Sequence, residues 1–141
     1  MREILFRGKA INRDSGFHRT NYKNGDWVYG LVTRLYDERF ENLPAEMTDI
    51  NCTSGIEIDY KTIGQYTGLI DKNGKKIFEG DLCLCNRNIN DRFDKTVFVI
   101  KYDELIGFYG ENEWGGNTIS ADEFDMCEIV GNIHDNKLED F

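Results

Sequence analysis

The sequence predicts a mainly β, antiparallel domain with one or two short helices, and three observations support this fold class. Runs rich in β-branched and aromatic residues recur along the chain, most clearly at residues 27–35 and 97–102. Fourteen glycines against a single proline indicate many tight turns that depend on glycine. A helix-start pattern is found at Ser120 and Glu123, so we expect helix to be a minor component.

The first half of the chain predicts three strands. Residues 12–16 and, more strongly, 24–26 are typical of turns, and the second turn leads into the strand at 27–35. Gly30 inside that strand indicates a bulge or a close backbone approach. The first strand is expected at residues 3–11, with its better core face formed by Ile4, Phe6, Gly8 and Ala10.

Residues 36–54 carry no clear pattern, and we expect a long irregular excursion there with one helical turn at 37–43. Residues 56–60 alternate as a half-buried strand, which continues in the same style through 62–70. Asn73 and Gly74 then form the strongest hairpin signal, as a type I′ pair or as a type I turn with Gly74 in a bulge.

The second half predicts further short strands. They are expected at residues 76–78, 82–86, 97–102, 106–110, 114–119 and 127–134. The run at 97–102 is apolar on both faces, which is typical of a central strand. One short helix is expected at residues 121–126, where the Ser120 and Glu123 side chains match a capping box. The turn at 79–81 resembles the one at 24–26.

Length and composition predict one folded domain over residues 1–141. This length suffices to bury a core without disulfides or metal. Hydrophobic residues make up 40% of the chain and aromatic residues 13%, which excludes disorder over its whole length. The net charge of −9 argues against nucleic acid as a partner, because phosphate binding needs clustered cations.

The four cysteines are expected to be reduced and buried as small apolar residues. No apolar signal run follows Met1, and no stretch reaches the length of a membrane helix, so we expect a cytoplasmic protein without a membrane partner. Cys83 and Cys85 share one face of a strand, but a structural zinc site usually needs a second such pair. Cys52 and Cys127 are single residues, and we expect no metal.

Four parts of the chain carry a resemblance to a known family. They are the central Gln65-Tyr-Thr-Gly-Leu with Asp71-Lys-Asn-Gly-Lys and Ile77-Phe-Glu-Gly-Asp81, the opening Met1-Arg-Glu-Ile-Leu-Phe-Arg-Gly-Lys, the motif Asn24-Gly-Asp-Trp-Val-Tyr-Gly, and the closing Cys127-Glu-Ile-Val-Gly-Asn-Ile-His-Asp-Asn. Together they resemble the YopX-like family of phage and prophage proteins. The resemblance implies a small, barrel-like β fold of complex topology, a bacterial host cell and a homo-oligomer. It supplies no catalytic residues.

The central motif has a structural interpretation, because turn chemistry accounts for its residue types. We expect Asp71 to accept backbone N–H groups in an Asx turn, and Asp81 to do the same before its strand. The expected apolar anchors are Tyr66, Leu69, Ile77 and Phe78. The motif residues are Gln65, Tyr66, Thr67, Gly68, Leu69, Asp71, Asn73, Gly74, Glu79, Gly80 and Asp81.

The sequence contains no catalytic motif that we recognise, and we expect neither catalytic nor cofactor-binding residues. Asp71 begins a stretch like a calcium loop, but its glycine and its last acidic ligand fall at the wrong positions. A nucleophile elbow and a phosphate-binding loop are also missing from the sequence. An enzyme would need a site assembled from distant residues, for which Glu79, Asp81, His18 and His134 are the candidates.

These observations favour a non-enzymatic, homo-oligomeric interaction or structural module, whose partner is itself and, in addition, a host or phage protein. One alternative is an acidic regulator or decoy that binds a host nucleic-acid-binding protein, as the net charge allows. Another is a small nucleic-acid-binding β-barrel, with bases stacking on Trp27, Tyr29, Tyr66, Phe108, Tyr109 and Trp114.

Overall fold

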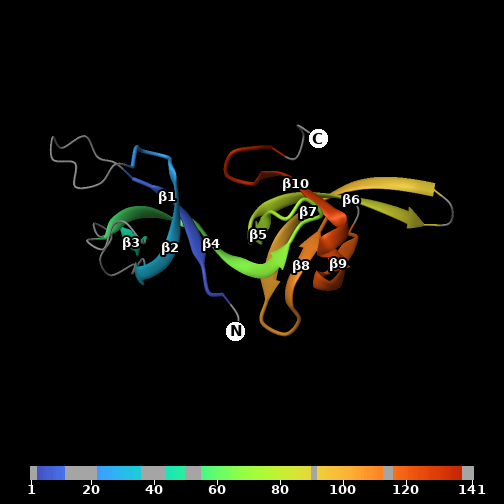
Figure 1. Cartoon of the computed structure of the whole chain (residues 1–141), viewed down its shortest axis with the longest axis horizontal. Helices are drawn as coiled ribbons and strands as arrows, with labels where there is room; N and C mark the ends of the chain where they lie inside the picture. Colours follow the sequence, from blue (N-terminus) through green and yellow to red (C-terminus); the bar gives the residue numbers. More distant parts are fainter. Residues whose placement is uncertain are drawn as a thin grey trace. The chain divides into compact units, whose positions relative to one another are not determined.

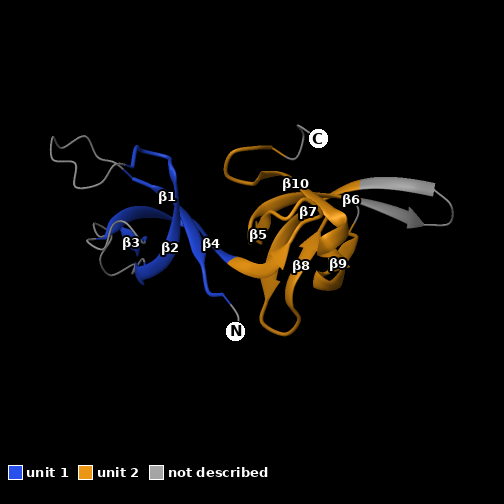
Figure 2. Ribbon diagram, viewed as in Figure 1, with its two compact units in different colours: residues 1–65 blue, residues 66–141 orange. Residues whose placement is uncertain are grey.

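The computed structural model describes residues 3–11, 22–35, 44–49, 55–89, 92–112 and 116–137. Strands account for 63% of it and helix for 6%, which confirms the mainly β, antiparallel fold. The chain forms two compact units, residues 1–65 and 66–141 (Figure 2). The expected turn at 12–16, the helical turn at 37–43 and Trp114 lie outside the described residues. One domain over residues 1–141 stays a prediction.

The first unit is built from four strands that partly close into a ring (Figure 1). They are β1 (Phe6–Ala10), β2 (Trp27–Arg34), β3 (Ala45–Thr48) and the first part of β4 (Ile56–Ile70). Each is antiparallel to the next, and β1 also pairs with β4. The prediction of a long irregular segment at 36–54 is therefore wrong at Ala45–Thr48, which form β3. That strand is short, and its pattern of two buried side chains, Ala45 and Met47, is too brief to be recognised.

The inside of this ring confirms two expectations from the sequence, but Ile4, also expected on the core face of the first strand, is 64% exposed and precedes β1. Gly8 lies on the core face of β1, and a Cβ atom there would come within 2.5 Å of the Ile58 side chain. Gly30 marks a close backbone approach, because a Cβ atom would lie 1.8 Å from the Thr48 carbonyl oxygen. The core around them consists of Ala10, Val28, Ala45, Met47, Ile56 and Ile58.

The second unit contains a five-stranded antiparallel sheet in the order β10-β6-β7-β8-β9. Its strands are β6 (Asp81–Ile89), β7 (Arg92–Asp103), β8 (Gly107–Glu111), β9 (Thr118–Ser120) and β10 (Cys127–Asn132). The central place of β7 is as predicted. A further short strand, β5 (Lys76–Phe78), pairs with the end of β4. The core of this unit includes Ile77, Cys83, Phe98, Ile100, Ile119 and Phe124.

The one helix of the described residues is the 3₁₀ helix η2 (Ala121–Met126), at the predicted position. The capping box is wrong, because the Ser120 side chain makes no capping hydrogen bond. Ser120 is the last residue of β9, and the tighter 3₁₀ turn does not offer the N–H spacing of an α-helix. Phe124 holds the helix in place, since its side chain is fully buried.

The two glycine–aspartate turns that look alike in sequence have the same local geometry. Gly25 and Gly80 have φ angles of 88° and 90°, which is the left-handed region that favours glycine. The Asp26 carboxylate accepts the Lys23 N–H at 2.9 Å. In the same relation, the Asp81 carboxylate accepts the Phe78 N–H at 2.8 Å. Each turn therefore begins a strand, β2 in one unit and β6 in the other.

Candidate functional site

The central motif is a hairpin followed by a tight corner. Its turn is closed by two backbone hydrogen bonds, from Gly74 N–H to Asp71 O at 3.0 Å and from Asp71 N–H to Lys75 O at 2.8 Å. Gly74 has a φ angle of 82°, and its bond to Asp71 makes Lys72 and Asn73, not Asn73 and Gly74, the central residues of the turn. Of the two predicted turn types, this is the type I turn with Gly74 in a bulge.

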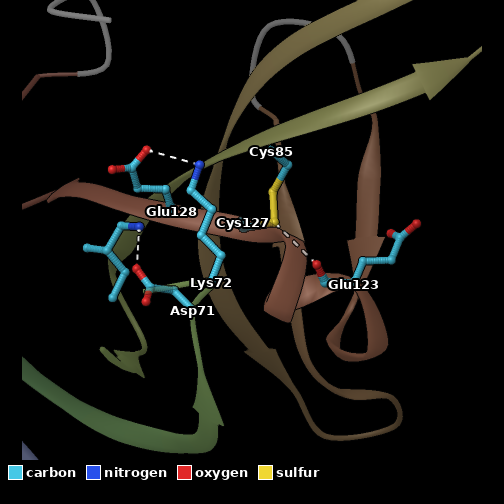
Figure 3. Close-up of a disulfide and its surroundings, with 7 residues drawn as sticks. Asp71, Lys72, Cys85, Glu123, Cys127 and Glu128 are labelled. Atoms are coloured by element: carbon cyan, nitrogen blue, oxygen red, sulfur yellow. Dashed lines mark hydrogen bonds and ion pairs between the residues drawn. A yellow bond between two sulfur atoms is a disulfide. The ribbon is translucent and has the colours of Figure 1, made fainter. Parts of the chain in front are cut away.

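Asp71 is the centre of this turn, and its side chain is only 3% exposed. One carboxylate oxygen accepts the N–H groups of Asn73 and Lys75, both at 2.9 Å, which is the predicted Asx turn. The other accepts the N–H of Ile129 in β10 at 3.0 Å (Figure 3). Burial by itself raises the pKa of the Asp71 carboxyl, but the three N–H donors hold it below its ordinary value.

The same turn covers the outer edge of β10, an edge strand of the second sheet. The Lys72 N–H donates to Cys127 O at 2.9 Å, beside the bond between Asp71 and Ile129. The Lys72 ammonium also lies 3.5 Å from the Glu128 carboxylate (Figure 3). Unpaired edge groups are a template for unwanted strand pairing, so the turn protects β10 as well as shaping the hairpin.

The remaining motif residues fix the corner and the strand pair. Thr67 is buried, and its hydroxyl donates to Ile77 O at 2.9 Å. Gly80 donates its N–H to Ile100 O at 2.8 Å, which ties the corner to β7. Tyr66 and Phe78 are buried with ring centroids 5.6 Å apart, as expected of anchors. Leu69 is not an anchor, because it is 37% exposed near the end of β4.

The other four motif residues complete the placement. Gln65 pairs with Phe6 at the end of the first unit, Gly68 has a φ angle of 85°, Glu79 is half-buried, and Asp81 is buried.

The expectation of reduced cysteines is wrong for Cys85 and Cys127, which form a disulfide between β6 and β10 (Figure 3). The two residues are direct cross-strand partners, and their Cα atoms are 4.4 Å apart. Cys83 is buried in the same core as a thiol. Within the described residues, no group of three or more His, Cys, Asp or Glu side chains is arranged to hold a metal ion.

Three of the four residues considered for a site assembled from distant parts of the chain lie at one corner of the second unit. They are Glu79, Asp81 and His134. His134 lies at the corner between Glu79 and Asp81, where its Nε2 atom is 3.6 Å from the place of a Cβ atom on Gly80. Asp81 faces inward and accepts the Phe78 N–H, so its carboxylate serves the corner. His18 lies outside the described residues.

The aromatic side chains considered for base stacking have different surroundings. Tyr66 is buried, and Phe108 packs against Tyr102 at 5.0 Å between ring centroids. Trp27 carries two cations over its ring, the Arg7 guanidinium at 4.7 Å and the Lys9 ammonium at 5.3 Å. Tyr29 is exposed beside it on β2. They do not form one aromatic surface within the described residues, because Tyr66 faces a core.

Sequence reasoning missed the exposed apolar side chains, which are the second candidate for function. Leu105 is 95% exposed and Ile106 70% exposed in the turn between β7 and β8. On the first unit, Tyr29, Leu31 and Leu35 are exposed along β2. The alternation of β2 could have indicated the second surface, but no sequence signal separates an exposed Leu105 from a buried one.

Comparison with known proteins confirms the family that the sequence resembles, and the match includes the central and closing segments. The chain matches the model of the family described as YopX protein over residues 16–139. No curated protein matches the chain. Among the described residues, there is no helix with the length and apolar character needed to cross a membrane. Because the match covers most of its length, the chain belongs to the YopX protein family.

Proposed function

We propose that this chain is a non-enzymatic, homo-oligomeric interaction module that acts in the cytoplasm of a bacterial cell carrying a phage or prophage. The observation that carries this proposal is the exposure of large apolar side chains at ordered positions of both units. Exposed apolar clusters on small proteins commonly mark interaction surfaces. The clearest case is Leu105, at 95% exposure.

The chemistry of the central motif supports the same proposal. Asp71, Thr67 and Asp81 each use their side-chain oxygens to bind backbone groups of the chain itself. A side chain that already makes hydrogen bonds within the chain is poorly available to a ligand. Breaking those bonds would leave buried backbone groups unpaired. The motif therefore serves the fold, and the exposed apolar side chains are the better candidates for contact with a partner.

Light scattering coupled to size-exclusion chromatography tests this proposal, together with sedimentation velocity over a wide range of protein concentration. The expected result is a particle of at least twice the 16.4 kDa chain mass, with dissociation on dilution. A particle of one chain mass at every concentration would contradict the proposal.

A second candidate function is an acidic regulator that binds a nucleic-acid-binding protein of the host. It is favoured by the charge of the second unit, since residues 66–141 hold sixteen acidic and eight basic side chains. A dense negative charge attracts proteins that bind phosphate backbones. The test is affinity capture from host lysate at low and high salt, followed by displacement with DNA. A captured protein that salt and DNA release supports this function, and no capture at low salt contradicts it.

A further inference from the structure

We propose that the turn between β7 and β8 of one copy docks on the outer face of β2 of a second copy. We name the first surface the hairpin tip, formed by residues 102–106, and the second the β2 face, formed by Trp27, Tyr29 and Leu31. The inference rests on the proposed homo-oligomer and names the surfaces that make it.

The hairpin tip is an ordered structure. One Asp103 carboxylate oxygen accepts the N–H of Leu105 at 2.8 Å and that of Ile106 at 3.2 Å. Gly107 closes the turn with a φ angle of 80°. The Tyr102 ring at the base of the tip packs against Phe108. Leu105 and Ile106 are therefore held in place before binding, which lowers the entropy lost when a partner covers them.

The residue types at the tip are unusual for a turn. Turn chemistry explains Asp103, which accepts the two N–H groups, and Gly107, which takes the positive φ angle. It does not explain two large aliphatic side chains at the most exposed positions, where polar residues are usual. Leu105 and Ile106 together form a small, exposed apolar cluster. Such a cluster is suited to burial against an apolar surface of a partner.

The β2 face offers such a surface on the first unit. Alternate residues of a strand share one side, so Trp27, Tyr29 and Leu31 form a continuous row on β2. Tyr29 and Leu31 are exposed.

Strand register places cations beside this row. Lys9 lies opposite Trp27, and Arg7 lies opposite Tyr29. Both cations are held over the Trp27 ring, at 5.3 Å and 4.7 Å. Arg7 is buried, at 6% exposure, whereas Lys9 is half-buried, so Lys9 is the cation that borders the exposed apolar side chains of the β2 face.

Charge complementarity identifies a second copy of this chain as the occupant. The tip carries Asp103 and Glu104 beside its aliphatic residues, and the unit around it has eight more acidic than basic residues. The unit of the β2 face is close to neutral, with nine basic and ten acidic residues. The acidic tip is therefore repelled less by the first unit of another copy than by its second unit, and Lys9 beside the β2 face attracts the tip carboxylates. The same acidic residues disfavour an anionic membrane as the occupant.

The test compares three variants with the wild-type chain by sedimentation velocity. Leu105→Ser/Ile106→Ser removes the two large aliphatic side chains of the hairpin tip, and Leu31→Ser removes one large apolar side chain from the β2 face. Met126→Ser is the matched control, because Met126 is an exposed apolar residue outside both surfaces. The expected result is a dissociation constant raised by about tenfold or more in the first two variants and unchanged in the control. Circular dichroism and the thermal midpoint verify that each variant is folded.

Mixing the variants adds a decisive measurement. The Leu31→Ser chain has an intact tip, and the Leu105→Ser/Ile106→Ser chain has an intact β2 face. An equimolar mixture is therefore expected to associate more tightly than either variant alone, through one intact contact.

The outcomes separate this inference from the proposed function. An oligomer that withstands both variants, or one that the Met126→Ser control weakens equally, overturns the inference and leaves the oligomer intact. A wild-type chain that is monomeric at every concentration overturns both.

Discussion

Asp71→Asn is the most informative substitution in the chain, because it keeps the size and shape of the side chain while it removes one acceptor oxygen and the negative charge. The wild-type carboxylate accepts three backbone N–H groups, from Asn73, Lys75 and Ile129. An amide has one oxygen and one NH₂ group. In either orientation, its NH₂ group faces at least one backbone N–H, and that donor loses its partner.

The cost follows from the bonds that are lost. A hydrogen bond to a charged group contributes about 1.5–3 kcal/mol, and an unsatisfied buried donor costs about 1–3 kcal/mol. Asp71→Asn, with the Ile129 bond lost, should therefore lower the free energy of unfolding by about 2–3 kcal/mol. Asp71→Ala removes all three acceptor bonds and should cost about 3–5 kcal/mol.

Urea unfolding monitored by tryptophan fluorescence and circular dichroism measures these losses. Asp103→Asn is the matched control, because Asp103 also accepts two N–H groups in an Asx turn. Both of its bonds end on one oxygen, which an asparagine retains, and the turn is exposed, so we expect a cost below about 0.5 kcal/mol. Hydrogen exchange should also show loss of protection at the Ile129 amide. An equal loss of unfolding free energy for Asp71→Asn and Asp103→Asn would contradict this prediction.

Three further predictions concern pH, the disulfide and the closest backbone contact. The pKa of Asp71 is lowered in the folded chain, so its stabilisation is present above its ordinary value of 3.8 and is lost as the pH falls through the folded-state pKa. The stability difference between wild type and Asp71→Asn should therefore shrink in acid, as pH-dependent urea titrations can measure. Reduction of the disulfide between Cys85 and Cys127, 42 residues apart, should lower stability by about 4 kcal/mol on a chain-entropy estimate. The double serine variant should show no response to reductant in the same melts. Gly30→Ala should cost more than about 2 kcal/mol in urea unfolding, because its Cβ atom would lie 1.8 Å from the Thr48 carbonyl oxygen.

Local turn chemistry was the part of this fold that the sequence predicted best. The Asx turn at Asp71 and the positive φ angles of Gly74 and Gly80 are local features, and their chemistry admits few conformations. The central place of β7 was also predictable, because a strand apolar on both faces must be covered on both sides. The partner of the second Asp71 oxygen was not predictable, since Ile129 lies 58 residues away.

Long-range register explains the other differences between prediction and structure. Cys85 and Cys127 form a disulfide because β6 and β10 pair with these residues directly opposite. A shift of register by one residue would place the two side chains on opposite faces. The exposure of Leu105 is likewise a property of the completed hairpin, because the sequence favours burial of any leucine. The candidate interaction surface is therefore a property of the folded hairpin and not of its local sequence.

In the proposed function, the central motif holds the fold and the exposed apolar surfaces bind another copy. The most direct test measures self-association and stability together in wild type, Asp71→Asn and Leu105→Ser/Ile106→Ser. At a temperature where all three are folded, sedimentation velocity should give the same dissociation constant for wild type and Asp71→Asn. The Leu105→Ser/Ile106→Ser chain should keep its unfolding free energy and lose association. An Asp71→Asn chain that is folded but no longer associates, beside a tip variant that still does, would contradict the account.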